Sequence, residues 1–423
     1  MNKILNRFFD DISPIFMIGV LLVSSFVVAQ DNDDDVEEIV VKGNVLYSDQ
    51  VNALKTPVPI MDVPQTVSIV TDEDIRKQGL REIGDIVRYT PGVNTSQGEG
   101  HRDAVVFRGV RSTADFFQDG NRDDVQYYRS LYNVEQVEIL RGPNALLFGR
   151  GGTGGVINRV SKKAALGETF GAVDFGLDSF GANDIAVDYN TGTGDTTAVR
   201  MMIHSDALEN HRDHYDGRRL GFNPTVKIQM NDTTTLDISY EHADHERYID
   251  RGVPTENGEP VERFEKITFG GNENLTTLKA NILRATLSKQ FSDTRKGNLS
   301  VVSSDFEKMY KNYYASGYTA GASVVTMDGY LDPTERENTI ISGSMVNEVG
   351  KHTLLVGAEL IDTTNNNHRY NTFWSTTSDD NEVFTITRPM NFTVNSAGVA
   401  TNNDYTADLK SKTKSDIDVT SIY

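Results

Sequence analysis

The chain has 423 residues, no cysteine and a formal net charge of −20. The lack of cysteine excludes a disulfide framework and thiolate metal sites, and the negative charge argues against nucleic acid as a partner. Only 38% of the residues are hydrophobic, and no stretch is long enough for a membrane-spanning helix. A β-barrel stays open as a fold class, because only alternate residues of its strands face lipid.

The first 29 residues have the composition of a secretory signal peptide. Lys3 and Arg7 precede an apolar run at residues 15–28, and the small residue Ala29 follows it. A positively charged start, an apolar core and a small residue at the cleavage site are the features of an export signal. We therefore expect cleavage after Ala29 and export of the rest of the chain.

A tether and a short β-prone run come next. The sequence QDNDDD at residues 30–35 is acidic and predicts a disordered tether. The run Glu38, Ile39, Val40, Val41 then lies between polar segments. An isolated strand has unpaired edges, onto which a partner protein can add a strand. Taken alone, such a run is more often an ordinary strand.

Residues 62–92 predict one strand and two short helices. The segment VSIVT alternates as a half-buried strand, and its last residue, Thr71, is suited to cap a helix that Gly79 terminates. Residues 81–89 predict a second helix, because their apolar side chains share one face, and Pro91 and Gly92 stop it. We interpret both helices as core packing without a chemical role.

Residues 96–129 carry the candidate ligand contacts. A strand at residues 105–107 ends in Arg108 and Gly109, and residues 117–122 predict a hairpin with Asp-Gly at its turn. The loops GEGHRD, STADFF and DDVQYYR are rich in arginine and aromatic residues, which suit a bulky aromatic anion. Pairing of the arginines with the chain's many carboxylates explains them equally well. The candidate contacts are His101, Arg102, Phe116, Tyr127, Tyr128 and Arg129.

Residues 132–163, YNVEQVEILRGPNALLFGRGGTGGVINRVSKK, predict two strands around a glycine-rich loop. Val137 and Ile139 alternate with polar residues until Arg141-Gly-Pro breaks the strand, because proline cannot donate to a sheet. Five glycines lie between Gly149 and Gly155, and a second β-branched run follows. The loop lacks the Gly-Lys-Ser/Thr ending of a phosphate-binding loop, so we do not expect that function.

From residue 164 onward the sequence predicts repeated amphipathic strands. About ten strands are predicted up to the last residue, with aromatic side chains near several strand ends. The polar segments 211–216, 248–274, 310–332 and 365–413 are expected to be long loops on the extracellular side. Two histidine pairs, His211/His214 and His242/His245, lack a closed ligand set, and we do not expect a metal site. No nucleophile or acid–base constellation occurs, so an enzyme is not expected.

The run at residues 132–163 resembles the end of the plug domain of TonB-dependent outer-membrane receptors, in particular the siderophore receptors. The segments VPQTVSIVT and RYTPGV resemble the same plug, and the arginine-rich loops look closest to receptors for ferric catecholate siderophores. The resemblance implies an all-β membrane barrel of about 22 strands with an N-terminal α+β plug in its lumen. The implied organisation is a signal peptide at 1–29, a periplasmic tether with a TonB box at 30–55, a plug at 56–163 and the first part of the barrel at 164–423.

The resemblance also implies a function and its partners. Such a receptor imports a ferric siderophore, here of the catecholate type, across a Gram-negative outer membrane. Its partners would be TonB with ExbB/ExbD, the siderophore, and outer-membrane lipid and lipopolysaccharide; no cofactor is expected, since iron is only cargo. Glu38, Ile39, Val40 and Val41 would be the TonB box. Arg108 and Arg141 match the arginines that lock the plug to glutamates of the barrel wall.

Two alternatives and one departure from the family accompany this interpretation. Another cargo, such as a hydroxamate siderophore, cobalamin or an oligosaccharide, would suit the same architecture. A signal-transducing receptor is disfavoured, because the tether after Ala29 is too short for a signalling domain. The predicted strands number fewer than half of about 22, and an open barrel would expose unpaired edges to lipid. We therefore expect the sequence to be the front part of a longer protein.

Overall fold

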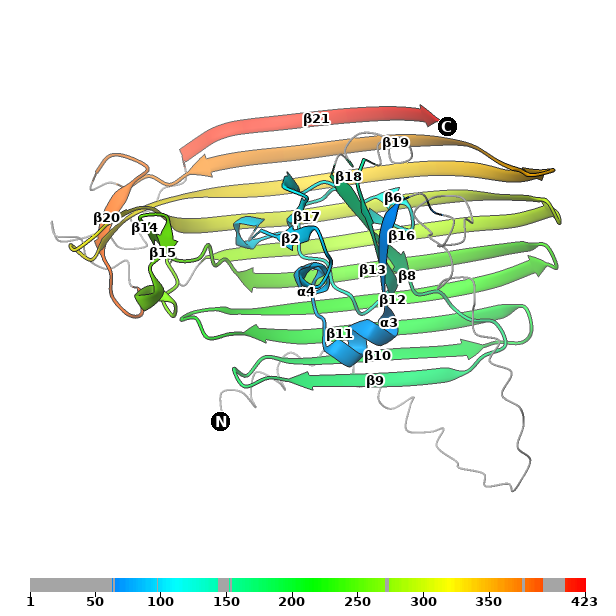
Figure 1. Cartoon of the computed structure of the whole chain (residues 1–423), viewed down its shortest axis with the longest axis horizontal. Coiled ribbons are helices and arrows are strands. Elements are labelled where there is room, and N and C mark those ends of the chain that lie inside the picture. The colour runs from blue at the N-terminus through cyan, green and yellow to red at the C-terminus, as the bar shows by residue number, and fades with distance from the viewer. Residues whose placement is uncertain are drawn as a thin grey trace, which may run out of the picture. The chain divides into compact units, whose positions relative to one another are not determined.

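The computed structural model describes residues 63, 65–96, 98–143, 152, 154–270, 274–374, 377–390 and 408–423. The predicted signal peptide, tether and TonB box lie outside these residues. Within the described ranges, no helix combines the length and the apolar composition needed to cross a membrane. The described residues form an N-terminal part that ends at Ser161 and a large antiparallel sheet that begins at Phe170 (Figure 1).

Two small sheets build the N-terminal part. The first has the order β1-β7-β8-β5-β6, in which β5 and β8 are parallel and the other pairs antiparallel. The second has the order β2-β3-β4. The strands are β1 (Thr66–Thr71), β2 (Val93–Thr95), β3 (Val105–Phe107), β4 (Val110–Ser112), β5 (Phe116–Gln118), β6 (Asn121–Arg122), β7 (Val134–Arg141) and β8 (Gly155–Ser161). The strands and the Asp-Gly hairpin expected here are thereby confirmed.

Two short helices, α3 (Asp72–Gln78) and α4 (Ile83–Arg88), follow β1. Thr71 caps α3, because its hydroxyl accepts the Asp74 N–H at 3.2 Å while the Asp74 carboxylate accepts the Thr71 N–H at 3.2 Å. Gly79 ends the helix at a φ of 62°, which glycine adopts without strain. The predicted cap and stop are confirmed, and α4 is somewhat shorter than the predicted 81–89.

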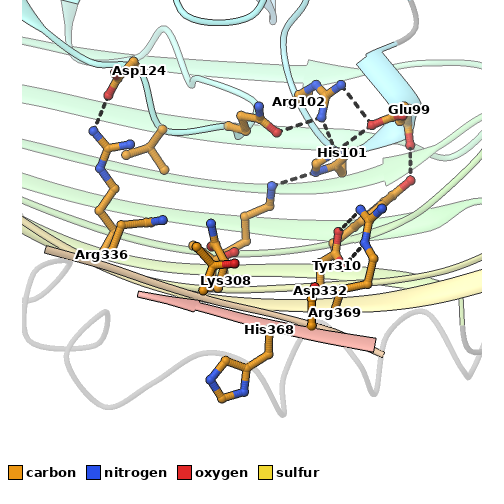
Figure 2. Close-up of a pocket in the computed structure, with 17 residues that line it drawn as sticks. Glu99, His101, Arg102, Asp124, Lys308, Tyr310, Asp332, Arg336, His368 and Arg369 are labelled. Atoms are coloured by element: carbon orange, nitrogen blue, oxygen red, sulfur yellow. Dashed lines mark hydrogen bonds and ion pairs between the residues drawn. The ribbon is translucent and has the colours of Figure 1, made fainter. Parts of the chain in front are cut away.

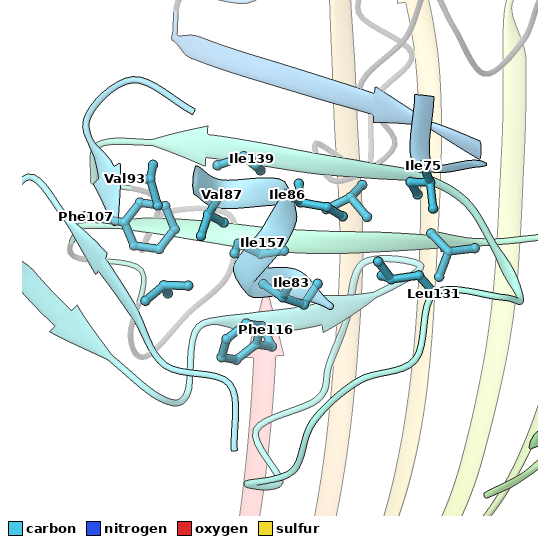
Figure 3. Close-up of a cluster of buried hydrophobic side chains, with 13 residues drawn as sticks. Ile75, Ile83, Ile86, Val87, Val93, Phe107, Phe116, Leu131, Ile139 and Ile157 are labelled. Atoms are coloured by element: carbon cyan, nitrogen blue, oxygen red, sulfur yellow. The ribbon is translucent and has the colours of Figure 1, made fainter. Parts of the chain in front are cut away.

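The apolar core of the N-terminal part lies between these helices and the first sheet (Figure 3). Ile83, Ile86 and Val87 of α4 are at most 2% exposed and pack with fully buried Ile139 and Ile157 of the sheet. The helices therefore serve as packing elements, as predicted.

A close approach of backbone and ring within this core requires glycine at position 155. A Cβ placed there would lie 2.5 Å from the Leu140 carbonyl oxygen and 2.6 Å from a ring carbon of Phe107. This accounts for one of the glycines that the sequence concentrates before the second β-branched run.

The large sheet is a meander with ten strands on its main path. Its order is β21-β19-β18-β17-β16-β13-β12-β11-β10-β9, and β20 pairs with β18 at one end. The ten strands confirm the number expected from the alternating pattern. They are β9 (Phe170–Leu177), β10 (Asn183–Gly192), β11 (Thr197–Glu209), β12 (Asp216–Asn231), β13 (Thr234–Tyr248), β16 (Leu275–Ser292), β17 (Arg295–Thr319), β18 (Val324–Val349), β19 (His352–Asn371) and β21 (Asp408–Ile422); β20 is Glu382–Thr385.

The predicted loop at residues 310–332 is wrong. β17 and β18 continue through this segment, pairing Tyr310 with Asp332 and Thr319 with Val324, and β19 likewise extends into the expected loop at 365–413. In β17 and β18, buried side chains such as Tyr313, Val325 and Met327 alternate with more exposed ones, but glycines at positions 317, 321 and 329 interrupt the apolar pattern along the sequence. Backbone pairing with the neighbouring strand holds these extensions in the sheet.

A second apolar core covers the far end of the β17–β18 hairpin. Loop residues that include η4 (Glu262–Phe264), preceded by the short pair β14 (Thr255–Glu256) and β15 (Glu259–Pro260), pack there with residues around β20. Phe264, Met327, Trp374 and Phe384 are members of this cluster, and each is at most 6% exposed. This end of the hairpin is therefore a packed structure with its own core.

Candidate functional site

A polar cavity of about 350 Å³ lies between the N-terminal part and the large sheet (Figure 2). Two loops of the N-terminal part line it, residues 99–102 and 124–126, together with β17, β18, β19 and β21. Its charged and aromatic lining consists of Glu99, His101, Arg102, Asp124, Lys308, Tyr310, Asp332, Arg336, His368 and Arg369. Most of these groups ionise, so the cavity suits a charged ligand.

The loop at residues 98–103 is fixed to the sheet by contacts with β17. Glu99 and Gly100 have φ values of 64° and 76°, and a Cβ on Gly100 would lie 2.7 Å from the Asp250 carbonyl oxygen. The Tyr310 hydroxyl donates to the Glu99 carbonyl at 3.0 Å. The Tyr310 ring also stacks on His101 with 3.8 Å between centroids. These contacts hold His101 at the boundary between the two parts.

Each arginine of the cavity has a carboxylate partner. Arg102 pairs with Glu99 at 2.9 Å, and Arg336 pairs with Asp124. Arg369 contacts both carboxylate oxygens of Asp332, at 2.8 and 2.5 Å. These bidentate and paired arrangements fix the guanidinium groups in place.

Lys308 differs from the arginines. Its Nζ lies 2.6 Å from Nδ1 of His101, and no carboxylate in the described part of the chain comes within ion-pair distance of it. The cavity therefore contains three arginines and Lys308 against the carboxylates of Glu99, Asp124 and Asp332. Among the described residues, Lys308 alone of these four side chains lacks a carboxylate within ion-pair distance, and burial lowers its pKa to about 7.

Burial and neighbouring charge set the protonation of the loop. Burial, and next the charge of Lys308, lower the pKa of His101 to about 3, so its imidazole is neutral at physiological pH. The contact with His101 and the charge of Arg102 lower the pKa of Glu99 to about 2 despite partial burial. Glu99 is therefore ionised when the cavity meets a ligand.

A second set of contacts ties the N-terminal part to another region of the sheet. Glu82, just before α4, pairs with Arg247 of β13 and lies 3.5 Å from Arg219 of β12. Arg219 also pairs with Asp206 of β11. Burial opposes ionisation of Glu82, but the charges of Arg247 and Arg219 outweigh it and lower the pKa of Glu82. We call Glu82, Arg219 and Arg247 the wall clamp.

Further polar contacts surround the wall clamp. Lys162, directly after the N-terminal part, lies 3.0 Å from Asp72 of α3 and 3.2 Å from Asp188 of β10. The Asn133 amide donates to the Asn223 side chain at 3.1 Å. The inward side chains of β10 to β13 thus hold the N-terminal part with opposite charges and hydrogen bonds.

Comparison with known proteins identifies the N-terminal part. Residues 59–156 match the family described as TonB-dependent Receptor Plug Domain. This part is a TonB-dependent receptor plug. The large sheet is the accompanying β-barrel sheet, and the protein belongs to the outer membrane of a Gram-negative bacterium. The resemblance noted in the sequence is confirmed.

Three relatives give the extent of the similarity. A "Probable TonB-dependent receptor BfrD" of Bordetella pertussis is 30% identical over 205 residues, 47% of this chain and 28% of the relative. The catecholate siderophore receptor Fiu of Escherichia coli is 29% identical over 257 residues, 56% of this chain and 32% of the relative. The crystal structure of Fiu in an open form has a TM-score of 0.68 at 18% identity and covers 86% of this chain and 67% of that structure. The chain thus spans about a third of the length of the curated relatives it matches.

Two of the six predicted ligand contacts line the cavity of the receptor, namely His101 and Arg102. Phe116 and Arg129 lie instead in the interior of the plug, and Tyr127 packs between the plug and the sheet, with its ring centroid 5.9 Å from that of Phe306 of β17. The Arg129 guanidinium packs over both rings, at 4.0 Å from the centroid of Phe116 and 4.5 Å from that of Tyr127. It also pairs with Asp103 at 3.3 Å and Asp123 at 2.9 Å. Arginine pairing with carboxylates, the alternative raised from the sequence, describes Arg129.

Tyr128 faces the wall clamp, because Arg247 lies over its ring at 4.0 Å from the centroid. It does not line the cavity either. A ligand-binding role for Phe116, Tyr127, Tyr128 and Arg129 stays a prediction.

The expected lock arginines lie on the plug. Arg141 is buried and donates to the Pro91 carbonyl at 2.6 Å and to the Ser68 hydroxyl at 2.7 Å. Burial, with the charge of Arg108, lowers the pKa of Arg141. Neither arginine has a carboxylate within ion-pair distance among the described residues, so a lock through barrel glutamates also stays a prediction.

Lys308 and the wall clamp were not predicted from the sequence. The signal that could have found Arg219 and Arg247 is their position at inward sites of predicted strands, where a charge requires a partner. Lys308 carries no comparable signal, because the strand around it was only partly recognised.

Proposed function

We propose that the protein imports a ferric siderophore of the catecholate type across the outer membrane, driven by TonB with ExbB/ExbD. The cavity between plug and barrel sheet carries this proposal. A ferric tris-catecholate is a bulky aromatic trianion, and this cavity offers cationic side chains beside the stacked rings of His101 and Tyr310. The name of the relative Fiu agrees with this cargo.

The plug supplies the coupling in this proposal. The cargo would bind both to loops of the plug and to strands of the barrel sheet, so its binding would influence the position of the plug. Binding would shift the population in which the TonB box, at residues Glu38 to Val41, is available to TonB. TonB would add to that segment as a strand and pull, and the plug would move to open a path.

Ile39→Pro tests the coupling step. Proline removes a backbone donor, so strand addition by TonB should fail while the cavity remains intact. We expect iron-starved cells carrying this variant to bind a radioiron-labelled ferric tris-catecholate at the wild-type level but not to accumulate it. Ile39→Val keeps the donor and serves as the matched control, with normal uptake. Uptake by Ile39→Pro at the wild-type rate would refute strand addition.

The cargo is tested separately by competition. Unlabelled ferric tris-catecholate should displace the label, whereas a neutral ferric trihydroxamate, cobalamin or an oligosaccharide should not. If wild-type outer membranes bind a competitor and not the tris-catecholate, the proposed cargo is wrong.

A further inference from the structure

The polar groups around His101 offer more hydrogen-bond donors than acceptors. Lys308 Nζ lies 2.6 Å from Nδ1 of His101, and Arg102 Nη1 lies 2.9 Å from Nε2 (Figure 2). Arginine has no acceptor, and a lysine ammonium has none either. Both ring nitrogens of His101 therefore face a cationic donor.

A neutral imidazole accepts at one ring nitrogen and carries a proton on the other. If Nδ1 accepts from Lys308, then the Nε2 proton points at Arg102. If Nε2 accepts from Arg102, the Nδ1 proton points at the ammonium of Lys308. A doubly protonated ring would accept from neither and would add a third charge. Arg102 Nη1 also donates to Gln126 Oε1 at 2.7 Å, whereas the ammonium of Lys308, with three N–H groups, has Nδ1 of His101 as its one acceptor among the described residues. Donor capacity of the Lys308 ammonium is therefore left unused, whichever ring nitrogen of His101 carries the proton.

A second donor in the same place is also unsatisfied. Nε of Arg102 is buried and has no hydrogen-bond partner among the described residues. The Arg102 side chain is 12% exposed, and His101 is 5% exposed. Solvent has little access to these groups, and buried donors without acceptors are costly.

The pairing of charged side chains in the cavity also singles out Lys308. Arg102, Arg336 and Arg369 each have a carboxylate partner, whereas Lys308 contacts His101 and the face of the Tyr310 ring and has no carboxylate within ion-pair distance in the described part of the chain. An anionic oxygen is the kind of ligand group that would both accept the surplus hydrogen bonds and pair with the Lys308 ammonium. The Tyr310 ring lies beside Lys308 and stacks on His101, so an aromatic face adjoins the donors.

Building on the proposed function, we infer that Lys308, Arg102 and His101 form the subsite that receives an anionic oxygen of the cargo, and that Lys308 selects anionic over neutral ferric complexes. On binding, the ligand oxygen takes the donor that His101 cannot accommodate. The preference arises because only an anion both accepts the hydrogen bond and neutralises Lys308.

Lys308→Met tests this inference, since it removes the ammonium and keeps the length of the side chain. We would measure equilibrium binding of two probes to outer membranes, a ferric tris-catecholate and a neutral ferric trihydroxamate. Loss of one charge-assisted hydrogen bond predicts about 10- to 100-fold weaker binding of the tris-catecholate. Binding of the trihydroxamate should not change. Lys308→Arg should retain most of the affinity for the anion, because it keeps a cationic donor.

Lys296→Met is the matched control, since Lys296 is exposed and lies on the same strand outside the cavity. It should leave both affinities at the wild-type level. Equal weakening of both probes by Lys308→Met, or no weakening of either, would overturn the inference. Failure of wild-type protein to bind the tris-catecholate would instead refute the proposed function. If Lys308→Met does not assemble in the membrane, Lys308→Gln replaces it with the same expected selectivity.

Discussion

The wall clamp makes a quantitative prediction for Glu82→Gln. The substitution removes the carboxylate that Arg247 and Arg219 share, while Arg219 keeps Asp206. Arg247 is only 7% exposed, so its guanidinium would be left buried beside Tyr128 without a charged partner. Breaking a buried pair costs about 3–5 kcal/mol, and because the Glu82 side chain is 26% exposed we expect about 2–3 kcal/mol.

The assay follows release of the plug in a urea series by limited proteolysis of the purified protein. The single tryptophan, Trp374, lies in the core at the end of the β17–β18 hairpin and does not report on the plug. The Glu82→Gln plug should become protease-sensitive at lower urea than the wild type. Glu73→Gln is the matched control: it removes the same charge from a pair with Lys77 whose side chains are 68% and 69% exposed, and it should leave the urea midpoint unchanged.

The direction of the Glu82 pKa shift determines how the stability difference between Glu82→Gln and the wild type depends on pH. The pKa of Glu82 is lowered in the folded protein, so its stabilisation is complete above the unfolded value of 4.5 and is lost as the pH falls through the folded value. The gap between Glu82→Gln and the wild type should therefore be full at pH 7 and shrink below about pH 4. Superimposed urea curves for the two proteins at pH 7 would refute the reasoning.

Two further predictions concern the plug. Because the pKa of His101 falls from 6.5 in the unfolded chain to about 3 in the folded one, the unfolded chain binds a proton between these values. Plug stability should decline as the pH falls from about 6.5 toward 3, and His101→Gln should flatten that part of the profile in the urea assay; identical profiles would contradict it. Gly155→Ala should destabilise the plug by about 1–3 kcal/mol, because its Cβ would overlap the Leu140 carbonyl and the Phe107 ring. Gly84→Ala is the control, because its Cβ would meet only a Thr95 methyl carbon at 3.6 Å and its φ is not positive; it should not destabilise the plug, and an equal loss of stability there would argue against overpacking at Gly155.

Local signals in the sequence predicted the elements of the plug well. The Thr71 cap, the Gly79 stop and the apolar face of α4 depend on neighbours a few residues away, and the structure has all three. The strand extensions at residues 310–332 were missed, because glycines at positions 317, 321 and 329 interrupt the alternation of their apolar residues.

The candidate site was predicted only in part, for a different reason. His101 and Arg129 lie in loops of the same composition, yet one lines the cavity and the other is fully buried in the plug. What separates them is the pairing of Arg129 with Asp103 and Asp123, residues 26 and 6 positions away in the chain. Similarly, Glu82 and Arg247 are 165 positions apart and meet only through the packing of plug on sheet. Composition indicates which residue types are present, whereas tertiary packing decides which of them remain available to a ligand.

The length of the β17–β18 hairpin has a consequence for ligand capture. A strand crosses a bilayer in about 9–11 residues, whereas β17 has 25 residues and β18 has 26. At roughly 3.3 Å per residue, much of this hairpin must stand clear of the membrane as paired sheet, closed at its end by the core around Trp374 and Phe384. Tyr310, Asp332 and Arg336 lie on this paired framework. A ligand that arrives there meets walls that are already ordered, so little conformational entropy is lost on binding, and tight capture of a dilute ligand requires no folding of a loop around it.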